Sequence, residues 1–302
     1  MKRKYGFVAD AFAHQVRGGA ELTTHALIEA AKNRNDVWMA PCTEITEQNL
    51  IDLYREDKIK NQKTHLIFGN FSTLDARMLP YIIQNFDYSV IEYDYKFCQY
   101  RSPEKHFASE DQECDCHESG LGKAVLMFYT AAKHVFFMSE LQRQVYADRF
   151  SDWAMNNTSV LSSVFSQSEW RTLENAITLQ KGVVRKDMWA YQRSTSWIKG
   201  SEDAEEWAYG QGCKYDPCGF TGLDTMEMYN FLSGVKGLVA LPRGGDTCPR
   251  MVIEAKLLGC ELHINENVQH ANEGWFANGT YDSIKEYLQS RTEVFWNILE
   301  GE

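Results

Sequence analysis

The sequence lacks several features that define other classes of protein. No run approaches the roughly 18 consecutive apolar residues that span a bilayer, and polar residues interrupt the longest candidates, 124–132 and 135–138. Positive charge is not in excess, because 31 lysines and arginines stand against 42 aspartates and glutamates, for a formal net charge of -11. This balance argues against a long basic surface for nucleic-acid phosphates. Internal repeats and low-complexity segments are also absent from the sequence.

A secretory signal is not expected either, because the basic residues 1–4 are followed only by a short strand-like run that ends at Asp10. We therefore expect a cytoplasmic protein with no transmembrane segment. In that compartment the eight cysteines are expected to be reduced thiols. The acidic balance does not exclude an anionic ligand, since a few local cations and helix N-termini can hold one.

The composition favours a well-packed protein, because hydrophobic residues make up 44% and aromatic residues 13% of the chain. Its 302 residues are enough for one large domain or two ordinary ones. Short apolar strands alternate with helices, which is typical of parallel sheets covered on both faces. We predict an α/β protein with domains 1–156 and 157–302, whose last helix, about 281–299, is a candidate to pack back on the N-terminal domain. The predicted strands are 5–9, 37–40, 65–68, 88–93, 134–138, 159–162, 188–191, 213–215, 237–241 and 261–264, and the main helices are 47–54, 74–83, 121–132, 201–209, 223–232 and 249–258.

The most informative motif is the stretch 237–260. A buried strand ends at Pro242, a glycine pair follows, and Pro249 stands where the first turn of a helix favours proline. The helix N-terminus would open at the carboxyl end of a strand, where α/β sheets bind ligands and where the helix dipole favours an anion. Asp246 and Glu254 could each accept hydrogen bonds from sugar hydroxyls. The alternative is an ordinary turn with a capping aspartate and a surface glutamate.

This stretch resembles the donor-binding motif of retaining glycosyltransferases of family 4, in which two glutamates flank seven residues. Asp246 stands in place of the first glutamate, and Glu254 matches the second. The resemblance implies that Glu254 binds the ribose hydroxyls of a nucleotide sugar. It also implies that Asp246 holds the donor sugar together with the adjacent backbone amides, which belong to Gly245, Thr247 and Cys248. The shorter aspartate is where sugar preference or activity would first depart from the family.

A second element upstream is similar to a motif of the same family. Arg193 and Lys199, followed by Gly200, match a pattern whose two cations neutralise the donor diphosphate. Fixed cations at this place would offset the charge that grows on the leaving nucleoside diphosphate. The alternative is a solvated basic turn without a ligand.

The N-terminal loop carries a third resemblance. Gly18 and Gly19 precede Ala20-Glu21 after the first predicted strand, as in the glycine-rich loop of the family. The resemblance implies that the glycine amides approach the donor phosphate or the acceptor. Glu21 and His14 are candidates for the acceptor side, although Glu21 could simply be an acid in the first turn of a helix.

Asp94 is the fourth candidate, at the end of the fourth predicted strand. Family members often place a histidine–aspartate pair there, close to the transferred sugar, and this sequence has Tyr93-Asp94. Asp94 is therefore expected either to contact the sugar or acceptor or to cap a loop. We count Asp94, Asp246 and Lys199 as the candidate catalytic residues.

Taken together, the motifs imply the GT-B fold, with two Rossmann-like domains facing across a cleft. The expected reaction moves a hexose from a UDP- or GDP-linked donor to an acceptor hydroxyl, with retention and without a metal. No cofactor is expected, because the nucleotide sugar is a co-substrate. The acceptor is a carbohydrate, a small molecule or a lipid, and a lipid would bring the protein to a membrane periphery. The alternatives are a nucleotide-sugar-binding protein without turnover and an epimerase on the same fold.

One cysteine cluster stands apart from these motifs. Cys114, Cys116 and His117 lie within four positions, with Cys98 upstream. Such soft ligands could hold zinc, but the spacing is not that of a standard finger or ribbon. A solvated loop with free thiols is the alternative.

Overall fold

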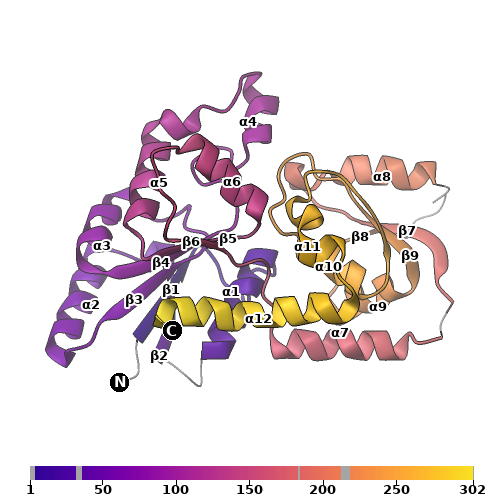
Figure 1. The fold of residues 1–302 in the computed structure, drawn as a ribbon, viewed down its shortest axis with the longest axis horizontal. Helices are drawn as coiled ribbons and strands as arrows, with labels where there is room; N and C mark the ends of the chain where they lie inside the picture. Colours follow the sequence, from indigo (N-terminus) through magenta and orange to yellow (C-terminus); the bar gives the residue numbers. More distant parts are fainter. Residues whose placement is uncertain (1–3, 32–35, 183, 212–217, 302) are drawn as a thin grey trace. The chain divides into compact units, whose positions relative to one another are not determined.

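The computed structural model describes residues 4–31, 36–182, 184–211 and 218–301. The chain divides into two compact units. The first unit comprises Met1–Arg101, Cys114–Ser166 and Leu288–Glu302, and the second comprises Ser102–Glu113 and Gln167–Tyr287. Figure 1 shows that each unit contains one sheet with helices packed around it.

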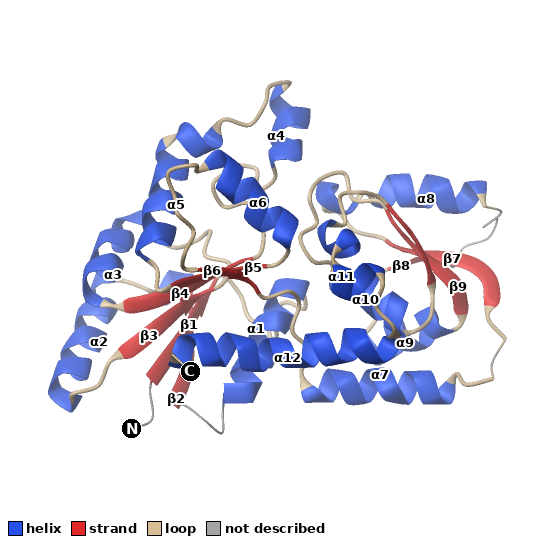
Figure 2. Ribbon diagram, in the orientation of Figure 1, coloured by secondary structure: helices blue, strands red, loops and turns tan. Residues whose placement is uncertain are grey.

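The sheet of the first unit has six parallel strands in the order β2-β1-β3-β4-β5-β6. Parallel pairing requires crossover connections, and here helices supply most of them (Figure 2). The strands are β1 (Lys4–Ala9), β2 (Asp36–Pro41), β3 (Thr64–Phe68), β4 (Asp87–Glu92), β5 (His134–Phe137) and β6 (Thr158–Val160). The helices are α1 (Gly19–Ala31), α2 (Glu47–Lys60), α3 (Leu79–Asn85), α5 (Gly120–Ala131), α6 (Glu140–Arg149) and the last part of α12 (Tyr281–Glu300), while α4 (Pro103–Glu110) lies between the first two stretches of this unit.

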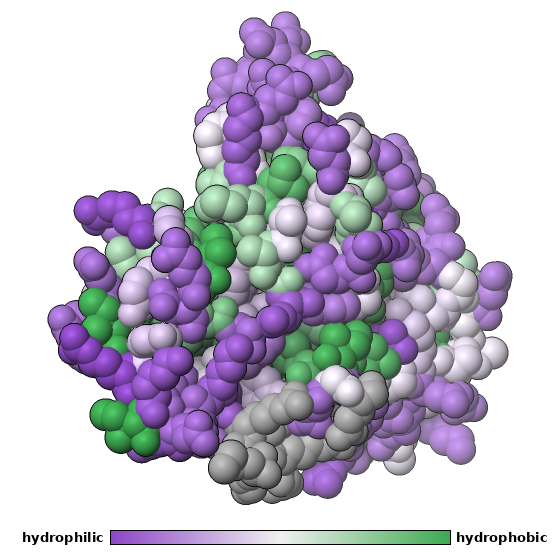
Figure 3. All heavy atoms as spheres, turned by 60° about the vertical axis from the view of Figure 1, so that its left-hand side comes forward, coloured by the Kyte–Doolittle hydropathy of each residue, from purple (hydrophilic) through white to green (hydrophobic). Residues whose placement is uncertain are grey.

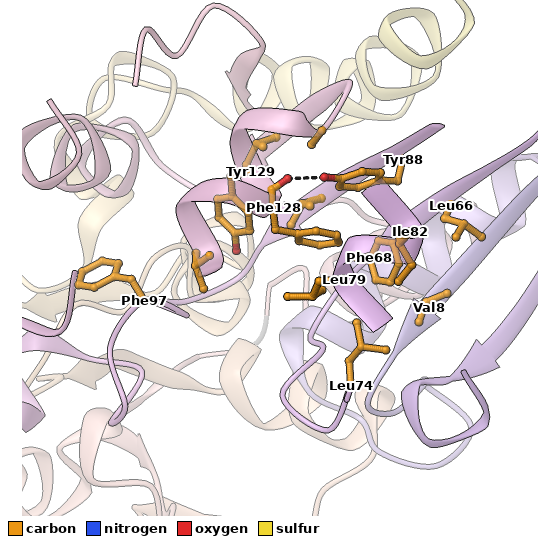
Figure 4. Packing of buried hydrophobic residues seen from close by; sticks show 14 of the residues in the cluster. Val8, Leu66, Phe68, Leu74, Leu79, Ile82, Tyr88, Phe97, Phe128 and Tyr129 are labelled. Atoms are coloured by element: carbon orange, nitrogen blue, oxygen red, sulfur yellow. Dashed lines mark hydrogen bonds between the residues drawn. The ribbon is translucent and has the colours of Figure 1, made fainter. Parts of the chain in front are cut away.

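Alternating side chains give the first sheet two apolar faces. On one face, Val8, Phe68 and Val90 pack with residues of α2, α3, α5 and α6 in a single buried cluster. Figure 4 shows part of this cluster, where the Tyr88 hydroxyl donates a hydrogen bond to the Phe128 carbonyl at 2.6 Å. Because the cluster joins strands to four helices, it fixes the strand ends from which the candidate residues project.

The opposite face of the first sheet is covered by α1 and by the end of α12. Trp296 of α12 meets the rings of Tyr5 and Phe7 edge-on, and its indole N–H donates to the Leu27 carbonyl of α1 at 3.2 Å. The Phe295 ring lies 4.7 Å from that of Phe136. Complete burial of two large aromatic side chains is worth several kcal/mol of hydrophobic stabilisation, at about 25 cal/mol per Å². The end of α12 is therefore part of the core of the first unit.

The second unit has a four-stranded parallel sheet in the order β10-β9-β7-β8. A small cluster under α8 packs Tyr191, Ala204, Ala208 and Val239 against Cys218. The strands are β7 (Lys186–Gln192), β8 (Gly219–Phe220), β9 (Val235–Ala240) and β10 (Glu261–Ile264). The helices are α4, α7 (Gln167–Leu179), α8 (Ser201–Gly210), α9 (Thr225–Ser233), α10 (Arg250–Leu257), α11 (Gly274–Ala277) and the start of α12.

Most predicted elements are present, with some differences. The helix predicted at 47–54 extends to Lys60, because Asn61 adopts a left-handed conformation that ends it. The helix predicted at 74–83, with a kink or a start at Pro80, begins at Leu79, so Pro80 lies in its first turn as that alternative expected. Helices α4, α7 and α11 and the short strand β8 were not predicted. The strand predicted at 213–215 lies outside the described residues.

The expectation of reduced cysteines is wrong at one position. Cys218 takes part in a disulfide. Six other cysteines of the described residues are buried and not in a disulfide, namely Cys42, Cys98, Cys114, Cys116, Cys248 and Cys260.

The surface of the protein is largely polar on the face shown in Figure 3, where hydrophobic side chains form separate small groups. Among the described helices, none combines the length and the apolar composition needed to cross a membrane.

Candidate functional site

In the second unit, two strand ends bring Lys199 and Asp246 together. Lys199 closes the short 3-10 turn after β7, and Asp246 lies in the loop after β9. The Lys199 ammonium donates a hydrogen bond to Asp246 Oδ2 at 2.6 Å. The lysine side chain is 38% exposed and the aspartate 16%. Two predicted residues that are 47 positions apart in the sequence thus form one ion pair at the carboxyl edge of the sheet.

A glycine allows the close approach of the two strand ends. Gly200 has φ of 56°, and a Cβ placed there would lie 1.9 Å from the Leu241 carbonyl oxygen. Only glycine can occupy this left-handed conformation without a steric collision. The sequence motif therefore carries glycine after Lys199 because the turn packs directly against the end of β9.

Hydrogen bonds from the segment after β10 hold the Asp246 loop. The Asp246 amide donates to the Asn267 carbonyl at 2.8 Å. The side-chain amides of Asn265 and Asn267 donate to the Pro242 carbonyl at 2.9 and 2.8 Å. The two asparagines were not predicted as site residues, although they follow a strand end in the sequence. They fix the backbone of 242–246, so the predicted backbone contacts of Gly245, Thr247 and Cys248 would come from a preformed loop.

Glu254 lies on α10, which begins directly after this loop. It is buried at 5% exposure, accepts a hydrogen bond from the Tyr229 hydroxyl at 3.0 Å, and lies 3.8 Å from Arg250 Nε. Burial raises the pKa of this carboxyl, and Arg250 partly opposes the rise. Glu254 is therefore not the surface glutamate of the alternative interpretation. It is a fixed carboxylate in the first two turns of a helix whose positive dipole end follows Asp246.

Arg193, the other predicted cation, lies just beyond β7 with a different set of contacts. Its guanidinium is 3.9 Å from a Glu205 oxygen and 5.9 Å from the centre of the Tyr191 ring. A Cβ on Gly219 would lie 2.5 Å from Arg193 Nε, so the glycine makes room for the arginine side chain. The structure gives Arg193 a defined place on α8's side of β7.

In the first unit, Asp94 belongs to a group of charges after β4. The Asp94 carboxylate pairs with Arg101 and lies 3.5 Å from the Lys96 ammonium. Glu92, fully buried, accepts from the Asp94 amide at 2.9 Å and from Lys96 at 3.0 Å, and it also accepts from the Tyr129 hydroxyl. Burial raises the pKa of Glu92 to about 7, although Lys96 opposes this shift. Asp94 is thus held by neighbours and is not a simple loop cap.

Arg101 links Asp94 to the N-terminal motif. It donates to Asn70 Oδ1 at 2.9 Å and to Ser72 Oγ at 2.5 Å, at the end of β3. Burial would lower the pKa of Arg101, but the Asp94 carboxylate raises it overall. Burial also raises the pKa of Glu21, whose carboxylate is bonded to Asn70 and interacts with Arg101. Two predicted acids therefore converge on an arginine that the sequence motifs did not indicate.

The remaining predicted residues lie around the start of α1. Gly19 begins the helix and Gly18 precedes it, with the Gly18 amide bonded to Glu21. His14 is exposed, and its ring stacks on that of Phe12 at 6.3 Å. Within the described residues, His14 is not part of the charged group around Arg101. Its acceptor-side role stays a prediction.

Comparison with known proteins gives matches in structure only. No protein-family model and no curated protein sequence matches the chain. Among solved structures, Anabaena HepE in complex with UDP is similar over 99% of this chain and all of its own, with a TM-score of 0.60 and 11% identity. Sucrose-phosphate synthase from Thermosynechococcus elongatus is similar over 96% of this chain and 90% of its own, with a TM-score of 0.59 and 10% identity. A glycosyltransferase from Rickettsia africae is similar over 99% of this chain and 94% of its own, with a TM-score of 0.52 and 11% identity. The two parallel sheets with their helices are therefore those of the GT-B fold.

Proposed function

We propose that this protein is a glycosyltransferase that moves a hexose from a UDP- or GDP-linked donor to an acceptor hydroxyl, with retention and without a catalytic metal. The observation that carries the proposal is the Lys199–Asp246 pair, which lies at the carboxyl ends of β7 and β9 immediately before α10. A cation, a carboxylate and a helix N-terminus in one place suit a diphosphate that is joined to a sugar.

Each side chain takes a role that its position supports. Lys199 and the start of α10 hold the diphosphate, with Arg193 as the second cation, and they stabilise the nucleoside diphosphate as it leaves. Asp246 accepts from the donor sugar. Glu254 accepts from the ribose hydroxyls, and its bond from Tyr229 keeps the carboxylate oriented. In the first unit, Asp94 and Glu21 serve the sugar and acceptor.

The structural relatives support a nucleotide-sugar donor. HepE is described in complex with UDP-glucose and with UDP and glucose, and its likeness to this chain extends over nearly the whole length of both. At 10–12% identity these relatives support the assignment of the fold alone. The donor site of this chain therefore rests on its own residues.

A second candidate function is binding of a nucleotide sugar without turnover. It is favoured by the ion pair itself, because Asp246 occupies the position of a longer family glutamate and neutralises the cation that a diphosphate needs. An epimerase is a weaker candidate, since a UDP-GlcNAc 2-epimerase from Methanocaldococcus jannaschii resembles the chain less well, with a TM-score of 0.51.

The direct test combines calorimetry with a transfer assay. UDP and GDP are titrated into the purified chain, and a panel of UDP- and GDP-sugars is then assayed for release of nucleoside diphosphate with sugar, small-molecule and lipid acceptors. We expect one nucleotide to bind and one donor class to turn over. Binding without release from any donor would favour the non-catalytic alternative, and absence of binding would contradict both.

Lys199→Ala tests the site itself. Loss of a charge-assisted hydrogen bond costs about 1.5–3 kcal/mol, so nucleotide affinity is expected to fall roughly 10- to 150-fold. Turnover should fall with it, because the same cation stabilises the leaving group. The matched control is Lys236→Ala, which removes a lysine on β9 that pairs with the exposed Asp187. Equal nucleotide affinity in the two variants would remove Lys199 from the proposed site.

A further inference from the structure

We propose that Cys98, Cys114, Cys116 and His106 form a structural zinc site. Each of the four side chains offers one ligand atom, and these atoms all lie within 4.8 Å of one another. All four residues are buried, at exposures of 7% or less. No metal is needed for the catalytic role proposed above, so this site is separate from that function.

The spacing of the four atoms fits a tetrahedral ion after a small contraction. A Zn–S distance of about 2.3 Å and tetrahedral angles put two sulfurs roughly 3.8 Å apart. The four atoms are already gathered within 4.8 Å, and a shift of about an ångström along flexible side chains would complete the geometry. Three cysteines and one histidine are a ligand set that closed, structural zinc sites use.

The histidine of the cluster is not the one that the sequence pattern indicated. His117 directly follows Cys116, but its ring faces the Glu118 carboxylate at 3.8 Å and lies outside the cluster. The histidine of the cluster is instead His106, on α4 (Pro103–Glu110). The ligands are therefore spaced by 8, 8 and 2 positions, which the standard finger patterns do not include.

The three cysteines are available as metal ligands. None of Cys98, Cys114 and Cys116 is in a disulfide, although the chain has a disulfide elsewhere. Hydrogen bonds among the three buried thiols would stabilise the fold only slightly, since sulfur is a weak hydrogen-bond donor and acceptor. A zinc ion deprotonates and binds them, and that gain becomes folding free energy.

The surroundings favour the negative charge of such a site. Arg149 donates to the Cys114 carbonyl at 2.6 Å, and its guanidinium lies 5.4 Å from the centre of the Phe97 ring, next to Cys98. Three thiolates and a neutral imidazole around Zn²⁺ leave one net negative charge. The partly buried guanidinium of Arg149 beside the ligands offsets it, as outer-shell partners of metal sites do.

The site would fasten the segment that leads from Asp94 to α5. Cys116 is already packed tightly against the start of α5, because a Cβ on Gly122 would lie 2.3 Å from the Cys116 carbonyl oxygen. Zinc would tie this point to Cys98, only three residues before Arg101. The metal would thereby stabilise the backbone that carries the Asp94–Arg101 pair.

The experiment measures metal in the full chain, purified without chelator. Elemental analysis is expected to give one zinc per chain, and the Co²⁺-exchanged protein should show thiolate charge-transfer bands together with the visible bands of a tetrahedral ion. Chelator should release the zinc and lower the melting temperature. Absence of metal from the purified chain, with no uptake of Zn²⁺ or Co²⁺ on addition, would overturn the proposal, as would a Cys114–Cys116 or Cys98–Cys114 disulfide in its mass spectrum.

Paired variants assign the ligands. Cys114→Ser should reduce the Co²⁺ charge-transfer intensity by roughly one third, as one of three thiolates is lost. His106→Ala should shift the visible Co²⁺ bands and weaken zinc retention, whereas His117→Ala should leave both unchanged. Cys42→Ala, at another buried free thiol, should also retain one zinc. Should Cys114→Ser fail to fold, the Co²⁺ spectrum of the unaltered chain still reports its thiolate ligands, and equal zinc retention in the two histidine variants would contradict the assignment of His106.

Discussion

At the scale of single residues, the main feature is a cation that is already paired before any donor is present. Lys199 and Asp246 share a 2.6 Å hydrogen bond in a partly exposed setting. A diphosphate would compete with the aspartate for the lysine, so Asp246 opposes nucleotide binding by its charge even if it assists the sugar. The two effects can be separated by substitution.

Asp246→Asn is expected to strengthen binding of UDP alone and to weaken transfer from the full donor. Removal of a like charge close to the phosphates gains on the order of 1 kcal/mol, or roughly three- to tenfold in affinity. Loss of the carboxylate removes the acceptor for a donor-sugar hydroxyl, so the transfer rate should fall by tenfold or more. Calorimetry with UDP and steady-state kinetics with the donor give the two numbers.

The control for this pair of effects is Asp187→Asn, at an exposed aspartate of the same sheet. It should change neither quantity. If Asp246→Asn left both UDP affinity and the transfer rate at the wild-type level, Asp246 would have no role beyond its ion pair.

The sequence predicted Lys199, Asp246 and Glu254 because each lies in a short motif with a recognisable spacing. Lys199 with Gly200, and Asp246 with Glu254, lie in short motifs. Arg101 could not be found in the same way. Its partners Asn70 and Ser72 follow a different strand, and its backbone has φ of 56°, which no residue pattern around it indicates. Contacts between distant strand ends depend on the strand order, which the alternation of elements does not reveal.

At the scale of elements, strands were easier to predict than helices. A buried parallel strand is a short apolar run, and β1, β3, β5 and β9 appear where such runs stand. Helix α4 was missed because His106 is its only buried side chain, which leaves little hydrophobic periodicity to detect. Helix α7 does carry a regular apolar face, formed by Trp170, Leu173 and Ala176, and its absence from the prediction is an error that the sequence pattern could have prevented.

The turn between β7 and α8 is the element whose geometry the site most depends on, and Gly200→Ala tests it. The substitution forces a left-handed alanine and drives its methyl group into the Leu241 carbonyl. The combined cost should be about 2–4 kcal/mol, and nucleotide binding should weaken because Lys199 is displaced. Urea unfolding and calorimetry with UDP measure the two losses.

Gly222→Ala is the matched control for this turn. Gly222 also has positive φ, at 70°, but no atom lies within 4 Å of an added Cβ. In Gly222→Ala the free energy of unfolding should fall by about 1–2 kcal/mol, the cost of the left-handed backbone alone, and nucleotide affinity should stay unchanged. Equal losses of stability in the two variants would show that the contact with Leu241 has no energetic weight.

At the scale of the whole molecule, stability depends on ionisable groups that the fold keeps neutral. Burial lowers the pKa of His134 to about 4, and burial with the nearby Lys256 lowers that of His270 to about 3. Burial acts in the opposite direction on acids and raises the pKa of Glu92 to about 7. The chain therefore carries opposing contributions between about pH 4.5 and 7, and single substitutions are needed to separate them.

His270 gives the clearest of these contributions. Below about pH 6.5 the unfolded chain gains a proton at this position that the folded chain does not, so stability is lost as the pH falls from about 6.5 toward 3. The loss from one such group amounts to about 1.4 kcal/mol per pH unit. In His270→Phe this part of the pH dependence should disappear.

His270→Phe should also fold well at neutral pH. Both ring nitrogens of His270 lack a hydrogen-bond partner among the described residues, and the ring packs against Trp275 and Phe276. An apolar ring of similar size therefore leaves no buried group unsatisfied. Urea unfolding followed by tryptophan fluorescence at pH 8, 6.5 and 5 gives the slope, and the exposed His25→Asn serves as the control that keeps the wild-type slope. A His270→Phe variant that lost as much stability between pH 6.5 and 5 as the wild type would show that His270 is not held neutral by the fold.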